Sequence, residues 1–177
     1  MANQKCGAPR PHAIAELARR AVETYVEEGR MLGPTSLPSG LPARAGVFVT
    51  IREGGGLRGC VGTIEPTAAT LAEEVVRSAV LAATDDPRFA PVERRELPSL
   101  SYEVSVLGEP ERVDGMGSLD PRAYGVIVVS GYRRGLLLPD IPGLDTAEQQ
   151  VGIARRKAGI GASEPVELYR FETLHFA

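Results

Sequence analysis

The sequence predicts an α+β fold, in which a single domain over residues 1–177 has a curved, barrel-like, mixed or antiparallel sheet and flanking helices. Three observations support this class. Segments with helical periodicity alternate with short β-rich segments. The β-rich segments include two glycine-containing hairpins, and a helical segment follows each hairpin. A chain of 177 residues with 43% hydrophobic and 24% charged residues can bury a core of its own.

The first predicted element is an amphipathic helix over His12–Gly29, in which apolar residues recur at steps of three and four. Pro11 suits the first turn of this helix, and Gly29 suits its C-terminal end. Residues 1–11 are expected to form a loose N-terminal segment. The stretch 33–46 is dense in proline and glycine, which predicts an ordered loop.

A hairpin is expected after this loop. Val47–Arg52 is rich in β-forming residues, Gly54–Gly56 supplies the turn, and Leu57–Gly62 is the returning strand. A second helix is expected over Thr67–Thr84, and it must end before Pro87.

Leu100–Leu107 is predicted to be a third strand, because apolar and polar residues alternate along it. A second hairpin is expected over Tyr124–Pro139. A third helix, capped by Asp145 or Thr146, should follow it, and a closing strand is expected over Pro165–Phe176.

The two hairpins resemble each other in sequence. Gly46–Val49 parallels Gly125–Val128 before the turn, and Arg58–Val61 parallels Arg134–Leu137 after it. An internal duplication of a β-hairpin-plus-helix unit would explain this similarity, and it predicts two such units that share one sheet. The alternative is chance, because short glycine-containing hairpins have similar compositions.

Charge and apolar patterning argue against several classes of protein. With a net charge of −3 the chain lacks the basic surplus that phosphate backbones require, so no nucleic-acid partner is expected. The N-terminus has no signal-peptide core, and the longest apolar runs are too short to span a bilayer, so no membrane contact is expected. A cytoplasmic location with reduced thiols is predicted.

The possible metal ligands of the softer kind are few. The chain has two cysteines and two histidines, Cys6, Cys60, His12 and His175, and their spacing fits no zinc-binding pattern. The sequence also has no phosphate-binding loop, dinucleotide-binding or serine-hydrolase motif. Neither a metal site nor a cofactor is predicted.

Cys60 is the first candidate for chemistry. The period of a strand places Arg58 and Cys60 on one face, where a guanidinium would favour the thiolate that acts as a nucleophile. Gly59 and Gly62 have no Cβ, so they would let a ligand or another backbone approach closely. The alternative is an inert cysteine that packs as a small hydrophobic residue.

Four further residues are candidates for a site. Glu103 lies in mid-strand among polar side chains, where it could act as a general acid or base or simply face solvent. Asp86 and Arg88 follow a helix end and could bind a polar ligand or form an ordinary turn. Arg134 could bind an anion from the second hairpin, although exposed arginines in turns usually bind nothing specific.

Several segments, taken in order, resemble the AMMECR-one domain family over nearly the whole chain. They are GVFVTI, LRGCVGTIEP, DDPRFAPV, YEVSVLGEPE and YGVIVVSGYRRGLLLPDI. The LRGC segment followed by Ile or Val and Gly is the hallmark of that family. The resemblance implies a single α+β domain with a curved, barrel-like sheet and an internal duplication. It also implies a functional surface at Arg58, Gly59, Cys60 and Gly62.

The resemblance supplies no reaction, because the biochemical activity of the family is unresolved. In prokaryotes such domains occur beside or fused to Memo-like proteins and near radical-SAM proteins, which implies a shared pathway. Two functions are therefore expected as alternatives. One is a site for a small-molecule ligand or a reaction at Cys60, assisted by Arg58 and Glu103. The other is a non-catalytic adaptor or regulatory module that binds a Memo-like partner.

Overall fold

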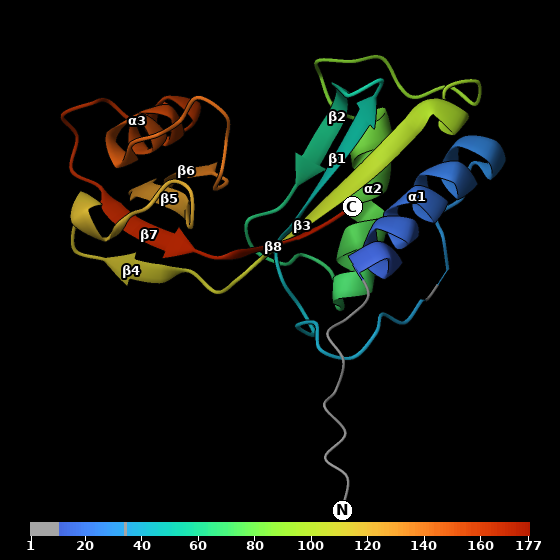
Figure 1. Ribbon diagram of the computed structural model, residues 1–177, viewed down its shortest axis with the longest axis horizontal. Coiled ribbons are helices and arrows are strands. Elements are labelled where there is room, and N and C mark those ends of the chain that lie inside the picture. Colours follow the sequence, from blue (N-terminus) through green and yellow to red (C-terminus); the bar gives the residue numbers. More distant parts are fainter. Residues whose placement is uncertain (1–10, 34) are drawn as a thin grey trace, which may run out of the picture. The chain divides into compact units, whose positions relative to one another are not determined.

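The computed structural model describes residues 11–33 and 35–177, which form two compact units (Figure 1). Unit 1 contains the described residues up to Val106 together with His175–Ala177, and unit 2 is Leu107–Leu174. Three α-helices and two antiparallel sheets confirm the α+β class. The prediction of a single curved, barrel-like sheet is wrong, because each hairpin belongs to an open four-stranded sheet of its own. That residues 1–177 act as one domain stays a prediction.

Unit 1 has one sheet, in the strand order β2-β1-β3-β8, and two α-helices. Its elements are α1 (Pro11–Glu28), β1 (Val47–Glu53), β2 (Gly56–Gly62), α2 (Leu71–Thr84), the 3-10 helix η1 (Leu97–Ser99), β3 (Leu100–Leu107) and β8 (Thr173–Phe176). The last residue of β3 and the first two residues of β8 belong to unit 2. The first hairpin and the third strand lie where the sequence predicts them. β1 pairs antiparallel with β2 on one side and with β3 on the other.

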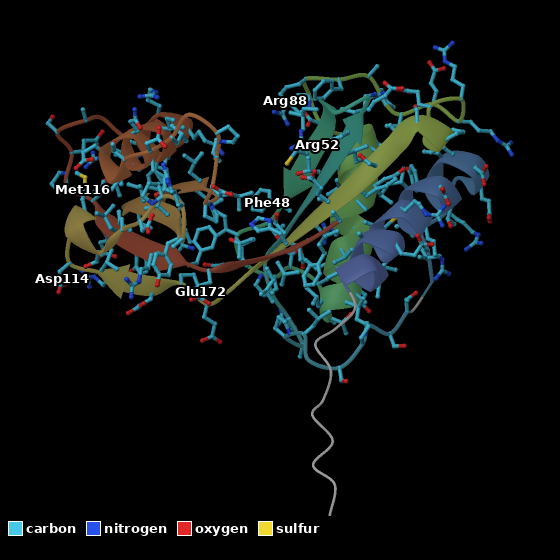
Figure 2. The ribbon with its side chains drawn as sticks, in the orientation of Figure 1. Phe48, Arg52, Arg88, Asp114, Met116 and Glu172 are labelled. Atoms are coloured by element: carbon cyan, nitrogen blue, oxygen red, sulfur yellow. The ribbon has the colours of Figure 1, made fainter. Side chains whose placement is uncertain are left out.

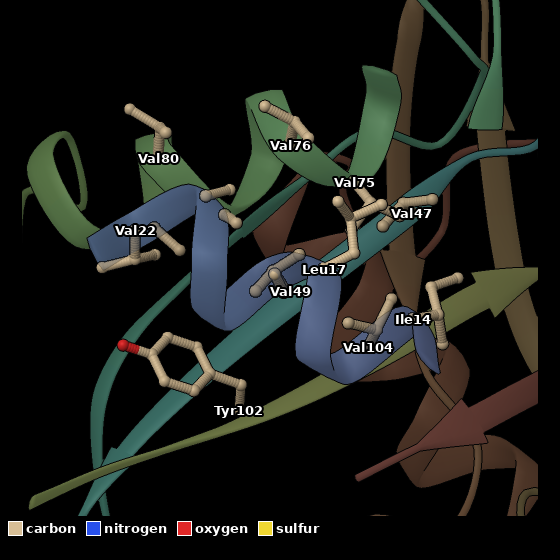
Figure 3. Packing of buried hydrophobic residues seen from close by; sticks show 14 of the residues in the cluster. Ile14, Leu17, Val22, Val47, Val49, Val75, Val76, Val80, Tyr102 and Val104 are labelled. Carbon is tan, nitrogen blue, oxygen red and sulfur yellow. The ribbon is translucent and has the colours of Figure 1, made fainter. Parts of the chain in front are cut away.

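The core of unit 1 forms between the two helices and one face of this sheet. The alternation of a strand sends Val47, Val49 and Ile51 of β1 toward the helices, and all three are fully buried. Figure 3 shows Leu17 of α1 and Val75 of α2 beside Val47. Burial of one such side chain contributes about 1.5–3 kcal/mol, so the cluster fixes both helices to the sheet.

Helix α1 has the predicted ends. Pro11 begins it, and Gly29 follows its last residue with φ of +70°, a conformation that glycine adopts without strain. The N–H of Gly29 donates to the carbonyl oxygen of Tyr25 at 2.9 Å. The prediction of a loose N-terminal segment concerns residues outside the described ranges, apart from Pro11.

Helix α2 begins at Leu71 and not at Thr67, because the preceding residues have other hydrogen-bond partners. Thr70 is the N-cap, and the carboxylate of Glu74 accepts the N–H groups of Thr67 and Ala68 at 2.7 and 2.6 Å. Glu74 is only 1% exposed. Burial raises the pKa of this carboxyl, but the hydrogen bonds outweigh burial and hold the pKa below its ordinary value. A buried charged carboxylate therefore fixes the loop ahead of α2.

Unit 2 has the second sheet, in the order β4-β7-β5-β6, and one α-helix. Its elements are β4 (Glu111–Val113), the 3-10 helix η2 (Met116–Ser118), β5 (Gly125–Ser130), β6 (Arg133–Leu137), α3 (Ala147–Lys157) and β7 (Glu167–Phe171). Thr146 caps α3 through a capping box with Gln149, which selects one of the two predicted caps. The predicted closing strand is in fact two strands, β7 and β8, which belong to different sheets.

The two hairpin-plus-helix repeats have the same topology. They lie in two separate sheets, so the prediction that both repeats share one sheet is wrong. In each, the first hairpin strand pairs with the second and with the strand that follows the helix. A Cβ on Gly59 would lie 2.1 Å from the carbonyl oxygen of Ala82 in α2, and one on Gly135 would lie 1.9 Å from that of Ala154 in α3. A glycine at the same place thus lets each helix touch its hairpin, which supports the predicted duplication.

The Gly59→Ala variant should lose about 2–4 kcal/mol of stability, because its methyl group would meet backbone that cannot move without shifting α2. Gly56→Ala in the same strand is the matched control, since its nearest neighbour would be the carbonyl oxygen of Glu53 at 3.5 Å, an ordinary contact. Urea denaturation measures both variants. Equal losses of stability would contradict the close packing of β2 on α2.

Candidate functional site

One face of the unit 1 sheet packs on α1 and α2, and the opposite face carries polar side chains. The strand register places Cys60 of β2 beside Thr50 of β1, and Thr50 beside Glu103 of β3. These three residues are termed the polar row. Paired residues of antiparallel strands point to the same face, with Cβ atoms about 4.5–5.5 Å apart. The row is therefore continuous across three strands.

Thr50 contacts the sulfur of Cys60 directly. Its hydroxyl donates to Sγ at 3.3 Å, and Cys60 is a free, half-buried cysteine. A donor at sulfur stabilises negative charge that develops there. The thiol thus combines partial access from solvent with a hydrogen-bond donor, which are features of reactive cysteines.

The backbone of Cys60 is held from outside the sheet. β2 is an edge strand, so its outward-facing N–H and C=O groups need other partners. The N–H of Cys60 donates to Oδ2 of Asp86 at 2.8 Å, and Nη2 of Arg88 lies 3.5 Å from the carbonyl oxygen of Cys60. Arg88 also donates to both oxygens of Asp86, at 2.9 and 2.6 Å. Asp86 and Arg88, termed the edge clamp, replace a neighbouring strand at this point. Figure 2 shows Arg88 beside β2.

The two members of the edge clamp stabilise each other as ions. Asp86 is 4% exposed, yet the hydrogen bonds from Arg88 outweigh burial and hold the pKa of Asp86 well below its ordinary value. The same bonds raise the pKa of Arg88, and a negative charge on the Cys60 sulfur would raise it further. Arg88 is therefore a guanidinium that lies close enough to interact with a negatively charged sulfur at Cys60.

Arg58 fastens the loop after α2 to β2. Its guanidinium donates to Glu96 at 2.7 and 3.1 Å and to the carbonyl oxygen of Ala90 at 3.0 Å. The guanidinium carbons of Arg58 and Arg88 lie 5.9 and 5.5 Å from the centre of the Phe89 ring, a favourable arrangement for cations. The contacts of Arg58 thus lie in the loop beside the edge clamp.

A β-bulge explains why Arg58 is directed to this loop. In the hairpin register Arg52 faces Leu57 and Ile51 faces Gly59, which leaves Arg58 as the extra residue. A bulge redirects the side chain of the extra residue away from the regular alternation. The prediction that Arg58 and Cys60 share one face assumed a regular strand.

Glu103 and His175 both have partners on the polar face. Glu103 pairs with Arg52, whose Nε lies 2.8 Å from Oε1, and both side chains are partly exposed. Two strand spacings, about 10 Å, separate β3 from β2. Ser105 Oγ and His175 Nδ1 lie 3.1 Å apart, with His175 on β8, one strand further from Cys60. General-base catalysis requires hydrogen-bond reach, directly or through one water, and at this spacing neither Glu103 nor His175 lies at direct hydrogen-bond distance from the thiol.

The glycines near Cys60 serve close packing within the chain. The missing Cβ of Gly59 faces α2, and a Cβ on Gly62 would lie 2.0 Å from the carbonyl oxygen of Val47 and 2.7 Å from the ring of Phe48. The sequence leaves open whether a ligand or another part of the chain approaches these glycines. The structure shows that the protein's own backbone and side chains approach them. Arg134 lies in β6 of unit 2, whereas Cys60 lies in unit 1.

Sequence analysis missed four residues of this site, Thr50, Arg52, Phe89 and Glu96. Counting residue pairs outward from the hairpin turn is the way to find the residue that faces Cys60. A count that ignores the bulge pairs Thr50 with Gly59, so it does not identify Thr50 as the neighbour of Cys60. The other three are recognised only by their contacts with distant residues. No local pattern in the sequence marks them.

Unit 2 has larger, mainly apolar residues where unit 1 has the polar row. Gly135 is the counterpart of Gly59, and the register from there gives the counterparts of the polar row. They are Leu136, Ile127 and Tyr169. Leu136 and Ile127 are buried. The shared topology therefore does not itself require a cysteine, a threonine and a glutamate.

Among the described residues no cluster of three or more His, Cys, Asp or Glu side chains could hold a metal ion. Cys6 and the side chain of His12 lie outside the part of the chain that the structure describes. Within residues 11–33 and 35–177, no helix is both long and apolar enough to cross a membrane.

Comparison with known proteins covers both units. The AMMECR1 family model matches residues 15–176. A protein of Thermotoga maritima is 49% identical over 164 residues, 90% of this chain and 94% of that protein. A protein of Clostridium acetobutylicum is 39% identical over 161 residues, 88% of this chain but 34% of that longer protein. The crystal structure of an uncharacterized protein from Pyrococcus horikoshii matches with a TM-score of 0.82 at 34% identity, over 92% of this chain and 88% of that one.

Asp86→Asn should cost about 1–3 kcal/mol at neutral pH, because a neutral amide replaces a buried carboxylate with charge-assisted hydrogen bonds. The pKa of Asp86 is lowered by folding, so its stabilisation is complete above the unfolded pKa of about 4 and is lost as the pH falls through the folded pKa. The stabilities of wild type and variant should therefore converge in acid. Urea denaturation as a function of pH measures this.

The exposed neighbour Asp85 supplies the control for this measurement. Asp85→Asn should leave stability nearly unchanged at every pH, because the structure uses the backbone of Asp85 to cap α2. If Asp85→Asn and Asp86→Asn gave the same pH dependence, the edge clamp would be contradicted.

Proposed function

The chain belongs to the AMMECR1 family, and we propose that its ligand or reaction site lies at Cys60 in the polar row. One observation carries the proposal: a half-buried free thiol receives a hydroxyl hydrogen bond while Asp86 holds its backbone. Any residue at this place on the strand edge needs an acceptor for its N–H, but a cysteine that only fills space in a core needs no hydroxyl at its sulfur. The arrangement instead fixes the position of the sulfur and leaves it partly accessible.

The surroundings of the sulfur suit a nucleophilic or redox thiol. Negative charge that develops on Sγ meets the Thr50 hydroxyl and the field of Arg88. The side chain of Arg88 is 55% exposed, so one small molecule could contact both the guanidinium and the thiol. The proposed ligand is therefore a small anionic or electrophilic molecule. In this proposal Arg58 supports the site from beside it, and Glu103 would contact the far end of a ligand that lies along the row.

The comparison of the two units supports this location. The counterpart of the thiol in unit 2 is buried Leu136, and the counterpart of Thr50 is buried Ile127. Polar residues that break the pattern of a fold without a structural need are candidates for function. A structural requirement common to both sheets would have produced similar residues in both.

A second candidate function is the non-catalytic binding or regulation of a protein partner. It is favoured because Glu103 and His175 are bound to Arg52 and Ser105, which leaves Cys60 without a base at hydrogen-bond distance among the described residues. The region that matches this chain makes up 34% of the Clostridium acetobutylicum protein, so in that organism a similar domain is part of a longer protein. In this hypothesis, as the family resemblance implies, the chain acts with a Memo-like protein and a radical-SAM protein in one cytoplasmic pathway.

In a Cys6→Ser background, iodoacetamide should alkylate Cys60 in the folded protein, with mass spectrometry as the readout. Thr50→Val should slow this reaction about threefold at neutral pH, because the loss of one hydrogen bond to the charged sulfur, about 1.5 kcal/mol, lowers the thiolate fraction about tenfold while the remaining thiolate becomes about threefold more nucleophilic. Thr50→Ser keeps the hydroxyl and is the matched control. A thiol that reacts only after unfolding, or equal rates for the two Thr50 variants, would contradict a reactive Cys60.

The adaptor hypothesis predicts a stable complex with a separate protein. The chain and a Memo-like protein encoded in the same genome should co-elute in gel filtration when they are expressed together. The matched control is the same mixture with an unrelated protein of similar size. Separate elution of the two proteins at micromolar concentration would count against an adaptor and leave the site at Cys60 as the proposed function.

A further inference from the structure

Unit 1 contains a cavity of about 630 Å³ between α1 and β3, on the side of β3 that faces away from β1. The residues that line it are Ala13, Ala15, Glu16 and Arg19 of α1, Leu100–Glu103 of β3, and Ala177. All of them belong to unit 1. The volume lies within the range of about 300–1,000 Å³ that ligand pockets occupy. Cys60 and the edge clamp do not line this cavity, but Glu103, at the far end of the polar row, does, so the cavity adjoins the proposed reaction site and shares this one residue with it.

The cavity follows the edge of β3 and not one of its faces. Four consecutive residues, Leu100–Glu103, line it, and consecutive residues of a strand point alternately to opposite faces. A space that touches all four must run along the backbone edge. Strand edges present N–H and C=O groups that can pair with a further strand. The other edge of the same residues is already paired with β1.

β8 shows that this edge accepts a strand. β8 neighbours β3 on the side away from β1, and it has four residues where β3 has eight. In the part of the chain that the structure describes, β8 therefore covers only part of this edge of β3. Ala177 directly follows β8 and lines the cavity, so the cavity begins where β8 ends. A strand placed in the cavity would continue the line of β8.

The apolar part of the cavity lies on the helix side. Ala13 and Ala15 of α1 are small and leave room above the strand edge, while Leu100 and Tyr102 of β3 supply apolar surface opposite them. This composition accommodates an apolar side chain of an extended segment. Alternate residues of a strand point to opposite sides, so the next residue of that segment would face the polar side of the sheet.

The charges around the cavity are in acidic excess. Arg19 is shared between Glu16 and Glu23, and Arg52 pairs with Glu103. Among the residues that line the cavity, Glu16 and Glu103 are acidic and Arg19 is basic, so carboxylates outnumber guanidinium groups there. A basic side chain on the incoming segment would balance this excess.

We propose that this cavity is a docking groove for an extended segment of a partner protein, which adds to the edge of β3 as a strand that continues β8. Main-chain hydrogen bonds to Leu100–Glu103 would provide affinity, and an apolar side chain beside Ala13 and Ala15 with a basic one beside Glu16 would provide specificity. Four residues span about 13 Å in a strand, so a short motif is sufficient. The proposal does not depend on chemistry at Cys60.

The test begins with selection of random displayed peptides on the full chain. The most enriched peptide is synthesised, and its binding is followed by calorimetry and by NMR of the ¹⁵N-labelled chain. We expect an extended sequence with alternating apolar and basic residues, and amide shifts centred on Leu100–Glu103. N-methylation of alternate peptide bonds should weaken binding about tenfold or more, because it removes main-chain donors.

Two variants of α1 complete the test. Ala13→Trp fills the groove, and Glu16→Lys reverses a rim charge on an exposed position, so each should weaken binding about tenfold. Glu27→Lys reverses a charge on the same helix outside the groove and should leave binding unchanged. The proposal is overturned if no peptide is enriched, if the amide shifts lie elsewhere, or if N-methylation has no effect. It is also overturned if the chain dimerises through this edge, because the occupant would then be a second copy.

Discussion

The buried carboxylate of Asp86 is the group on which the candidate site depends. It accepts the N–H of Cys60 at an unpaired strand edge and is neutralised by Arg88, so β2 is held on both of its sides. A buried N–H without an acceptor costs about 1–3 kcal/mol. Asp86 directly follows Asp85, the C-cap of α2. The end of the helix therefore positions the carboxylate, and the carboxylate positions the thiol.

The duplicated topology separates what the fold requires from what unit 1 adds. Gly59 and Gly135 allow the same close contact between hairpin and helix, so these glycines belong to the architecture. In unit 2 the carbonyl oxygen of Leu136, the counterpart of Cys60, accepts a hydrogen bond from Lys157 Nζ at 3.0 Å. A charged side chain thus holds the returning strand in both units. Unit 1 further supplies a carboxylate for the N–H and a hydroxyl for the thiol, and these additions support a function at Cys60.

Local patterns in the sequence predict most of the elements, because hairpins, caps and alternation depend on near neighbours. The arrangement of the sheets is not local. β7 and β8 are separated by one residue, Glu172, yet they belong to different sheets because their pairing partners are distant. At the site, the motif around Cys60 and the turn at Asp86 are visible in the sequence, but the contact between them is not. The role of Arg58 depends on a β-bulge and on Glu96, 38 residues away, and neither leaves a local pattern.

Amide hydrogen exchange of Cys60, measured by NMR, tests the central claim most directly. If the edge clamp holds Cys60, its N–H should exchange as slowly as the β2 amides that are bonded to β1, although Cys60 bonds to a side chain. This protection should disappear in Asp86→Asn and persist in Asp85→Asn. Rapid exchange of the Cys60 amide in the unmodified protein would contradict the account, because the thiol would then have no fixed backbone to position it.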